Sequence, residues 1–181
     1  MKLKIENTAI EAVKVLTPTR FTDIRGEFFE VYNRKEFEVL GIPCDFVQDN
    51  FSISKSAVIR GLHYQLEPYQ QDKLVCCTFG SIYDVAVDLR PDSKTFGKWF
   101  GIELSAKNRK QLLIPKGFAH GLQALEDESQ ACYKITAHYA PEYERCINPL
   151  DPILGINWPL DNVILSTKDS KAPMFNELLM K

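Results

Sequence analysis

The fold class follows from residues 73–89, which read KLVCCTFGSIYDVAVDL. Apolar and β-branched side chains fill this stretch on both sides of Gly80-Ser81, and short apolar runs bounded by turn residues are typical of buried β-strands. The stretch therefore predicts a hairpin, with strands over Lys73 to Phe79 and over Ile82 to Leu89.

Similar short runs recur along the chain, with turn residues between them, at the spacing expected of a β-sandwich or barrel. Weak helical periodicity is confined to Asn33 to Leu40, which Gly41 would end, and to Lys168 to Lys181, where one or two short helices are expected. Pro141 to Pro159 should form an extended loop. The further predicted strands are Phe28 to Tyr32, Phe46 to Ile53, Phe100 to Leu104, Gln111 to Ile114, Gln123 to Leu125 and Cys132 to Tyr139.

Length and composition indicate one domain over residues 1–181, with residues 160–181 as a helical tail. Of the 181 residues, 45% are hydrophobic, which is enough for a packed core. The net charge of −2 and the lack of a basic block argue against nucleic-acid binding. No apolar run approaches the roughly 18 residues that span a membrane, and no apolar segment follows the charged start as in a signal peptide.

The number and spacing of the cysteines indicate a protein without structural disulfides or a cysteine-bound zinc. The chain has five cysteines, an odd number without a CxxC pair, which argues against a disulfide framework and a zinc cluster. Cys76 and Cys77 would point to opposite faces of one strand as small core residues. We therefore expect a cytoplasmic protein in a reducing environment.

A candidate site lies in Arg60-Gly61-Leu62-His63-Tyr64-Gln65, with Lys73 shortly after it. A His is well suited to proton transfer near neutral pH, and two cations beside it favour an anionic substrate or intermediate. The alternative is a solvated strand end with a structural His. Residues an even number apart share a strand face, so Arg60 and His63 can meet only if the chain bends, and Gly61 is a natural position for a bend.

The second candidate His lies in Pro115-Lys116-Gly117-Phe118-Ala119-His120-Gly121. This pattern predicts a turn that aims the imidazole at a cavity, and a His that satisfies the turn backbone is the alternative. Position 65 is Gln, so the HxH pair that often holds a metal in small β-barrels is missing, and two His alone make a poor metal site. With His138 expected in solvent, His63 and His120 are interpreted as proton-handling or hydrogen-bonding groups without a metal.

Two further residues could act with these imidazoles. Tyr133 carries a phenol that can donate a proton at neutral pH, and a core aromatic with a satisfied hydroxyl is the alternative. Asp169 follows Ser166-Thr167-Lys168 and could cap the last helix. It could instead hold an imidazole in one tautomer. Sequence reasoning leaves both pairs of alternatives open.

The N-terminal run from Arg20 to Glu30 alternates charges, glycine and aromatic residues. A guanidinium beside glycine suits a phosphate oxygen, and an aromatic such as Phe28 suits a flat ring. Gln48-Asp49-Asn50 adds amide groups that could contact the edge of a ring. A surface strand and turn is the alternative for this region.

In the order and spacing of its motifs, the chain resembles the dTDP-4-dehydrorhamnose 3,5-epimerase family of nucleotide-sugar epimerases from about Arg20 to Asp169. The resemblance rests on Asp23 to Phe28, Gln48 to Ser52, Arg60 to Gln65, Val87 to Arg90, Thr95 to Trp99, Leu104 to Asn108, Ile114 to Gly121, Asp151 to Pro159 and Lys168-Asp169. The chain departs from the family pattern at Cys146 to Leu150, at Cys76-Cys77 and at Leu122 to Ala124.

The resemblance implies a cupin-type jelly roll that needs no metal or other cofactor, in a homodimer whose N-terminal strands cross into the partner. It implies His63 as the base, Asp169 as its dyad partner, Tyr133 as the opposing acid, and Lys73 near the keto oxygen. Residues expected to bind the nucleotide sugar are Arg25, Phe28, Glu30, Gln48, Asn50, Arg60, His120, Tyr139, Glu144 and Lys168.

The implied reaction inverts the carbons that flank the keto group, C-3, C-5 or both, of a nucleotide-linked 4-keto sugar in deoxysugar or polysaccharide biosynthesis. Alternatives are an epimerase for one carbon of a GDP- or CDP-linked hexose or heptose, a sugar 3,4-ketoisomerase, and a non-catalytic sugar-binding cupin. Retention of the proton-handling residues and the Asp23 to Phe28 stretch favour the epimerase.

Overall fold

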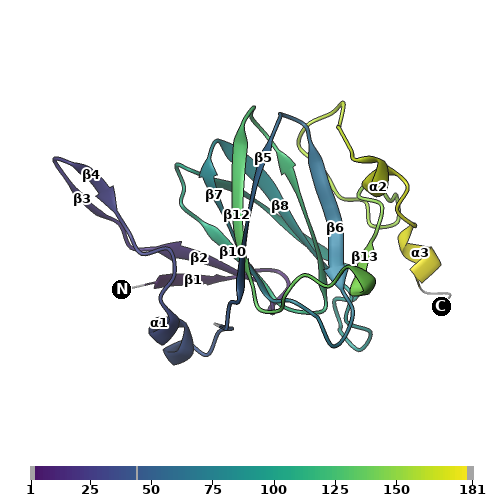
Figure 1. The fold of residues 1–181 in the computed structure, drawn as a ribbon, viewed down its shortest axis with the longest axis horizontal. Helices are drawn as coiled ribbons and strands as arrows, with labels where there is room; N and C mark the ends of the chain where they lie inside the picture. Colours follow the sequence, from purple (N-terminus) through teal and green to yellow (C-terminus); the bar gives the residue numbers. More distant parts are fainter. Residues whose placement is uncertain (1–2, 44, 179–181) are drawn as a thin grey trace.

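Two antiparallel sheets make up most of the fold in the computed structural model, which describes residues 3–43 and 45–178 (Figure 1). The six-stranded sheet has the order β1-β2-β10-β7-β12-β5 and the five-stranded sheet the order β13-β6-β11-β8-β9. Their strands are β1 (Leu3–Asn7), β2 (Lys14–Pro18), β5 (Gln48–Ser54), β6 (Ile59–Gln65), β7 (Lys73–Phe79), β8 (Ser81–Asp88), β9 (Trp99–Ser105), β10 (Gln111–Ile114), β11 (Phe118–Ala124), β12 (Ser129–Ile135) and β13 (Glu144–Cys146).

The main core lies between the two sheets. It contains Val75 and Cys77 from β7, Ile82 and Ala86 from β8, and Leu122 from β11, all of them buried. Burial of apolar side chains from facing sheets is what stabilises a sandwich. The all-β jelly-roll class predicted from the sequence is confirmed.

The predicted hairpin between residues 73–79 and 82–89 is wrong. Strand β7 pairs with β10 and β12, whereas β8 pairs with β9 and β11 in the other sheet. Gly80, with φ of +67°, connects the two, and a Cβ added there would lie 2.8 Å from the Ser129 hydroxyl. The chain therefore crosses between sheets at Gly80, because each strand buries one face in the shared core and finds its partners later in the sequence.

Other predicted boundaries also change. Residues 29–33 are not in a strand, and the short strand β4 (Gly26–Phe28) pairs with β3 (Phe21–Asp23) instead. The predicted turn around His120 ends at Gly117, and β11 runs from Phe118 through His120 to Ala124. β12 ends at Ile135 because the chain leaves the ladder there. The predicted loop at 141–159 holds a 3-10 turn and β13, which pairs with β6.

The predicted helices are confirmed within the described residues. Helix α1 (Arg34–Val39) ends before Gly41, which has φ of +65°. Helices α2 (Thr167–Ser170) and α3 (Phe175–Leu178) lie within the stretch from Lys168 to Lys181 and just before it, where one or two short helices were expected. The last three residues of that stretch, 179–181, lie outside the described residues, as does Cys44. In Figure 1 these C-terminal helices flank β6, and the β3–β4 hairpin projects from the opposite end of the molecule.

Strand β6 bends where the sequence predicts a bend. Gly61 has φ of +126°, and the register between β6 and β11 shifts between His120 and Leu122. A Cβ at Gly61 would lie 2.5 Å from Cα of Gly121 and 2.7 Å from the carbonyl oxygen of His120. Only glycine fits this approach, and the bend brings Arg60 and His63 to the same cavity.

Candidate active site

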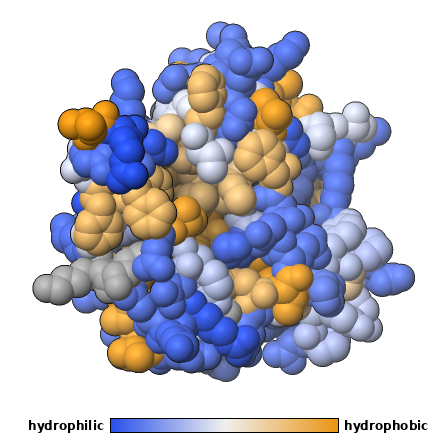
Figure 2. Space-filling model, turned by 60° about the vertical axis from the view of Figure 1, so that its left-hand side comes forward, coloured by the Kyte–Doolittle hydropathy of each residue, from blue (hydrophilic) through white to orange (hydrophobic). Residues whose placement is uncertain are grey.

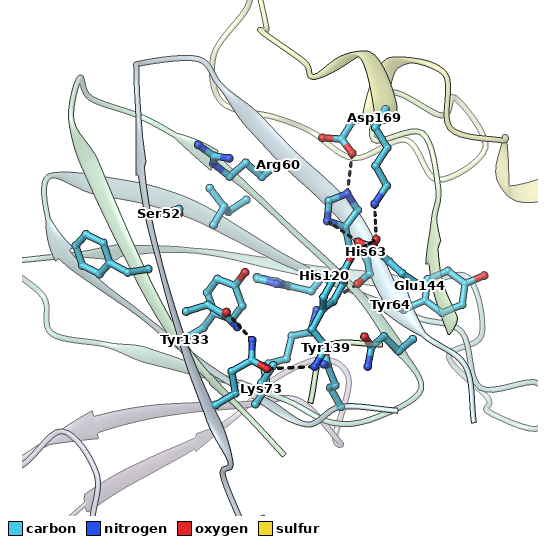
Figure 3. Close-up of a pocket in the computed structure, with 18 of the residues that line it drawn as sticks. Ser52, Arg60, His63, Tyr64, Lys73, His120, Tyr133, Tyr139, Glu144 and Asp169 are labelled. Carbon is cyan, nitrogen blue, oxygen red and sulfur yellow. Dashed lines mark hydrogen bonds and ion pairs between the residues drawn. The ribbon is translucent and has the colours of Figure 1, made fainter. Parts of the chain in front are cut away.

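A cavity of about 500 Å³ opens between the two sheets (Figure 3). Strands β5, β7 and β12 form one wall, strands β6, β11 and β13 form the other, and residues 166–169 close one side. Eleven of the fourteen site residues expected from the sequence line it: Gln48, Asn50, Arg60, His63, Lys73, His120, Tyr133, Tyr139, Glu144, Lys168 and Asp169.

His63 and Asp169 form a close pair. Nε2 of His63 lies 2.7 Å from Oδ1 of Asp169, which is only 3% exposed. Ser166 caps α2 by accepting a hydrogen bond from the Asp169 backbone N–H, so the capping role considered for Asp169 is filled by another residue. Burial acts to raise the pKa of Asp169, but the hydrogen bond and charge of His63 outweigh it and hold that pKa below its usual range.

Because Asp169 stays ionised, it accepts the Nε2 proton of His63 and leaves Nδ1 free to take another proton. Nδ1 lies 4.0 Å from Oε1 of Glu144, on the cavity side. The pair therefore has the arrangement of an oriented general base.

Lys73 is buried at the start of β7, with 7% of its surface exposed. Its ammonium donates a hydrogen bond to the carbonyl oxygen of His63 at 3.3 Å. Burial lowers the pKa of Lys73 to about 8. A cation in a site of low dielectric interacts strongly with a developing negative charge.

Tyr133 lies on β12, across the cavity from β6 (Figure 3). Its ring packs edge-to-face on His120, with 5.9 Å between centroids. Burial raises the pKa of the Tyr133 phenol, so the hydroxyl keeps its proton at neutral pH. An imidazole, that of His63, and a protonated phenol, that of Tyr133, thus face the cavity from opposite sheets.

Three polar side chains at the cavity mouth are connected by hydrogen bonds. Glu144 Oε2 accepts hydrogen bonds from Lys168 Nζ and, at 2.8 Å, from the Tyr139 hydroxyl. Burial acts to raise the pKa of Glu144, but these hydrogen bonds outweigh it and lower that pKa. The cluster therefore combines one carboxylate and one ammonium with a phenol.

The two remaining polar regions of the cavity come from β5 and β6. Gln48 Nε2 donates to Asn50 Oδ1 at 2.9 Å. Arg60 Nε donates to the Ser54 hydroxyl at 2.9 Å, which orients the guanidinium along the wall. Amide edges and a guanidinium are suited to a ring edge and to anionic oxygens, respectively.

Three predicted residues, Arg25, Phe28 and Glu30, lie outside this cavity. Arg25 and Phe28 are exposed on the projecting β3–β4 segment, where Arg25 pairs with Asp23. Glu30 accepts a hydrogen bond from Asn33 at 3.2 Å. These three residues are therefore separate from the eleven that line the cavity.

Sequence reasoning missed Asp84, which lies behind the cavity wall on β8. Asp84 has no exposed surface, and its Oδ1 accepts a hydrogen bond from Nε2 of His120 at 2.8 Å. The signal for it was present, because a carboxylate inside the apolar run of residues 82–87 must be buried and therefore needs a partner.

Among residues 3–43 and 45–178, no group of three or more His, Cys, Asp or Glu side chains is placed to hold a metal ion. None of the helices in the described part of the chain has the length and apolarity that crossing a membrane requires.

Comparisons with known proteins identify the family to which this site belongs. The family model described as dTDP-4-dehydrorhamnose 3,5-epimerase matches residues 7–177. The chain belongs to the dTDP-4-dehydrorhamnose 3,5-epimerase family. It is therefore an isomerase of the class that epimerises carbohydrates.

Similar members of this family cover nearly the whole chain. The dTDP-4-dehydrorhamnose 3,5-epimerase of Pseudomonas aeruginosa is 50% identical over 96% of this chain and 96% of its own length. That of Escherichia coli K12 is 49% identical over 98% and 97%. The structure of the Legionella pneumophila epimerase in complex with dTDP-4-keto-L-rhamnose is 47% identical over 97% of this chain and 94% of its own, with a TM-score of 0.92.

Proposed function

We propose that this chain epimerises the two carbons flanking the keto group of a dTDP-linked 4-keto-6-deoxyhexose, using His63 as the base and Tyr133 as the acid. The observation that carries the proposal is the placement of these two residues on opposite sheets, facing one cavity (Figure 3). Inversion of a carbon centre requires a proton to leave one face of the sugar and another to arrive on the opposite face.

The 4-keto group makes the hydrogens at C-3 and C-5 acidic, because the resulting carbanion delocalises onto the keto oxygen. Nδ1 of His63 removes such a proton, and Asp169 stabilises the imidazolium that forms. Lys73 stabilises the enolate oxygen as an ammonium, an electrostatic contribution that is often the largest in such sites. Tyr133 then delivers a proton from the opposite wall. The step conserves electrons and requires no cofactor.

Support for the nucleotide comes from relatives and from the cavity mouth. The name of the Legionella structure gives dTDP-4-keto-L-rhamnose as its ligand, and the related enzymes above are named for the same class of substrate. In this chain Arg60 and Lys168 supply cations for a diphosphate, and Gln48 and Asn50 supply amide groups for a base edge.

We further propose that the enzyme acts as a homodimer in which the β3–β4 segment reaches a second copy. Phe21 and Phe28 pair across this hairpin while 58% and 68% exposed, and Ile24 at its tip is fully exposed. On edge strand β5, Phe51 and Ile53 are each 56% exposed. Figure 2 brings this end of the molecule forward and shows apolar side chains on its surface. Exposed apolar surface of this kind favours association, and it would place Arg25, Phe28 and Glu30 at the partner's cavity.

The proposal is tested by incubating the protein with a dTDP-linked 4-keto-6-deoxyhexose in D₂O and following each C–H by NMR. We expect deuterium at C-3 and C-5, with inversion at both positions. Deuterium at one position only would restrict the activity to that carbon. A carbonyl that moves to C-3 would indicate a 3,4-ketoisomerase, and binding without exchange would indicate a sugar-binding protein, so either would refute the proposal.

A further inference from the structure

We infer that Asp84 is a positioning residue for this reaction, a buried carboxylate that fixes the tautomer of His120 and provides the countercharge of Lys73. The inference rests on the proposed function, in which Lys73 must be an ammonium to stabilise the enolate. Asp84 itself does not line the cavity. It would therefore act through His120 and Lys73, which line the cavity.

The fold places Asp84 beside His120 and brings Lys73 to the strand next to that pair. On the ladder between β8 and β11, His120 is the Cα partner of Ala86, so Asp84 lies diagonally beside His120 on the same face of the five-stranded sheet. Lys73 enters from β7 in the six-stranded sheet. Its ammonium donates a hydrogen bond to the carbonyl oxygen of His63, and His63 is the cross-strand partner of His120, so Lys73 reaches the strand next to the His120–Asp84 pair.

The pair with His120 has one consistent arrangement of protons. Nε2 of His120 lies 2.8 Å from the carboxylate, which can only accept when ionised, so Nε2 carries the proton and donates. Burial is the main factor that lowers the pKa of His120, so its ring is neutral at neutral pH. Nδ1 of His120 is then an acceptor, able to orient a substrate hydroxyl, because His120 lines the cavity.

The charges around Lys73 single out Asp84 as its countercharge. Burial opposes the ammonium, and Asp84 is the strongest of the charges that support it, ahead of Glu144. The same cavity is also lined by a second carboxylate, Asp169, which is paired with His63 at 2.7 Å, and by the cations Arg60 and Lys168, which cannot serve as a countercharge. His120 and the protonated phenol of Tyr133 carry no negative charge. Without Asp84, the buried amine would lose its proton more readily.

A purely structural role does not account for the bonding of Asp84. Asp88, on the same strand and also fully buried, accepts hydrogen bonds from the side chains of Arg90, Ser93 and Thr95. Oδ2 of Asp84 is buried and has no hydrogen-bond partner among the described residues. A buried charge with so few hydrogen bonds costs stability, which points to a role in the site for its charge.

The test is the isosteric variant Asp84→Asn, examined by the pH dependence of kcat and by NMR. In the wild type, kcat should fall as the pH rises through the titration of Lys73. In the variant this fall should move to lower pH by roughly 1–3 pH units, the usual effect of losing an adjacent opposite charge. A loss of folded protein would lower kcat equally at every pH and would not move the profile.

Asp88→Asn provides the matched control. It also removes a fully buried carboxylate from β8, but one whose partners lie in residues 90–95, away from the cavity. We expect it to lower the unfolding midpoint and to leave the pH profile unchanged.

NMR of the substrate-free protein separates this inference from the proposed function. The ¹³Cε resonance of Lys73 should titrate at lower pH in Asp84→Asn than in the wild type, and the ¹⁵N resonances of His120 should show the Nε2–H tautomer only in the wild type. Unchanged titration of Lys73 and an unchanged tautomer in a folded variant would overturn the inference. A moved titration with an unmoved kcat profile would support the electrostatic link and contradict the role of Lys73 in the reaction.

Discussion

His63, Lys73 and Tyr133 must occupy different protonation states at the same pH for the proposed reaction to proceed. The base must be neutral, the enolate stabiliser charged and the acid protonated. The structure arranges this by environment: ionised Asp169 orients His63, Asp84 supports the charge of Lys73, and burial keeps the Tyr133 phenol protonated. Three neighbouring groups can thereby act together near neutral pH.

Replacing Asp169 with Asn tests the orientation of the base. We expect kcat to fall on the order of 10²–10⁴-fold, because an amide can donate to Nε2 and stabilise the wrong tautomer of His63. Steady-state kinetics would show this with little change in KM. Asp151→Asn is the control, since Asp151 is also buried but accepts only backbone hydrogen bonds from Ile153 and Phe175 among its closest partners. Equal kcat values for Asp169→Asn and the wild type would refute the dyad.

The pH dependence of kcat tests Lys73. Its pKa of about 8 in the folded protein means that the ammonium is present below that pH and is lost above it, so kcat should decline as the pH rises through about 8. In Lys73→Arg the guanidinium does not titrate in this range, and the decline near pH 8 should disappear even if kcat is lower overall. Persistence of the decline in Lys73→Arg would assign it to another group.

Strand parity was the sequence feature that best anticipated the site. It required a bend at Gly61 for Arg60 and His63 to converge, and the structure has that bend. The sequence could not decide between the capping role and the dyad role of Asp169. The dyad role depends on whether His63, which is 106 positions away in the chain, lies beside Asp169 in the fold. The burial of Asp84 could be expected from the apolar run around it, but its partner could not, because His120 comes from another strand.

At the level of elements, the approach of β6 to β11 at Gly61 determines the shape of the cavity wall. Gly61→Ala would place a Cβ 2.5 Å from Cα of Gly121, so the strands must separate. We expect a loss of roughly 1–3 kcal/mol from overpacking, in addition to the backbone cost of the positive φ, and a large loss of kcat. Denaturant unfolding measures the first quantity.

Gly26→Ala is the control for this substitution. Gly26 has φ of +122°, close to the +126° of Gly61, but a Cβ there would meet nothing within 4 Å. It therefore carries the dihedral cost alone. If both variants lost the same stability, the close approach at Gly61 would not matter.

The errors at element level share one cause. Residues 73–79 form a strand as predicted, and the strand predicted over 82–89 forms over 81–88, but the pairing of both depends on strands that follow later in the chain. Similarly, Gly117 and Gly121 indicated a turn, whereas Gly121 instead allows close contact with β6 inside β11. Local patterns located the strands, and long-range packing decided the partners and boundaries.

At the level of the whole molecule, the proposed dimer would complete a site that one chain leaves without Arg25, Phe28 and Glu30. Mixing two inactive variants tests this. Arg25→Ala lacks the arginine that one subunit would contribute to the cavity of its partner. His63→Asn lacks the base that each subunit contributes to its own cavity. When the two are co-expressed, random mixed dimers should regain about a quarter of the wild-type sites, because each mixed dimer contains one intact site.

Activity of the mixture equal to the mean of the two separate variants would contradict sharing between subunits. Sedimentation of the mixture provides the control for association, since the mixed species must be dimeric for the comparison to hold.

The most direct test of the account is deuterium exchange catalysed by His63→Asn. With a dTDP-linked 4-keto-6-deoxyhexose in D₂O, the account predicts no exchange at C-3 or C-5 above the rate without enzyme, while the folded variant still binds the nucleotide sugar. His138→Asn, which changes an exposed His outside the cavity, should exchange like the wild type. Exchange by folded His63→Asn at the wild-type rate would contradict the account, because another group would then remove the proton.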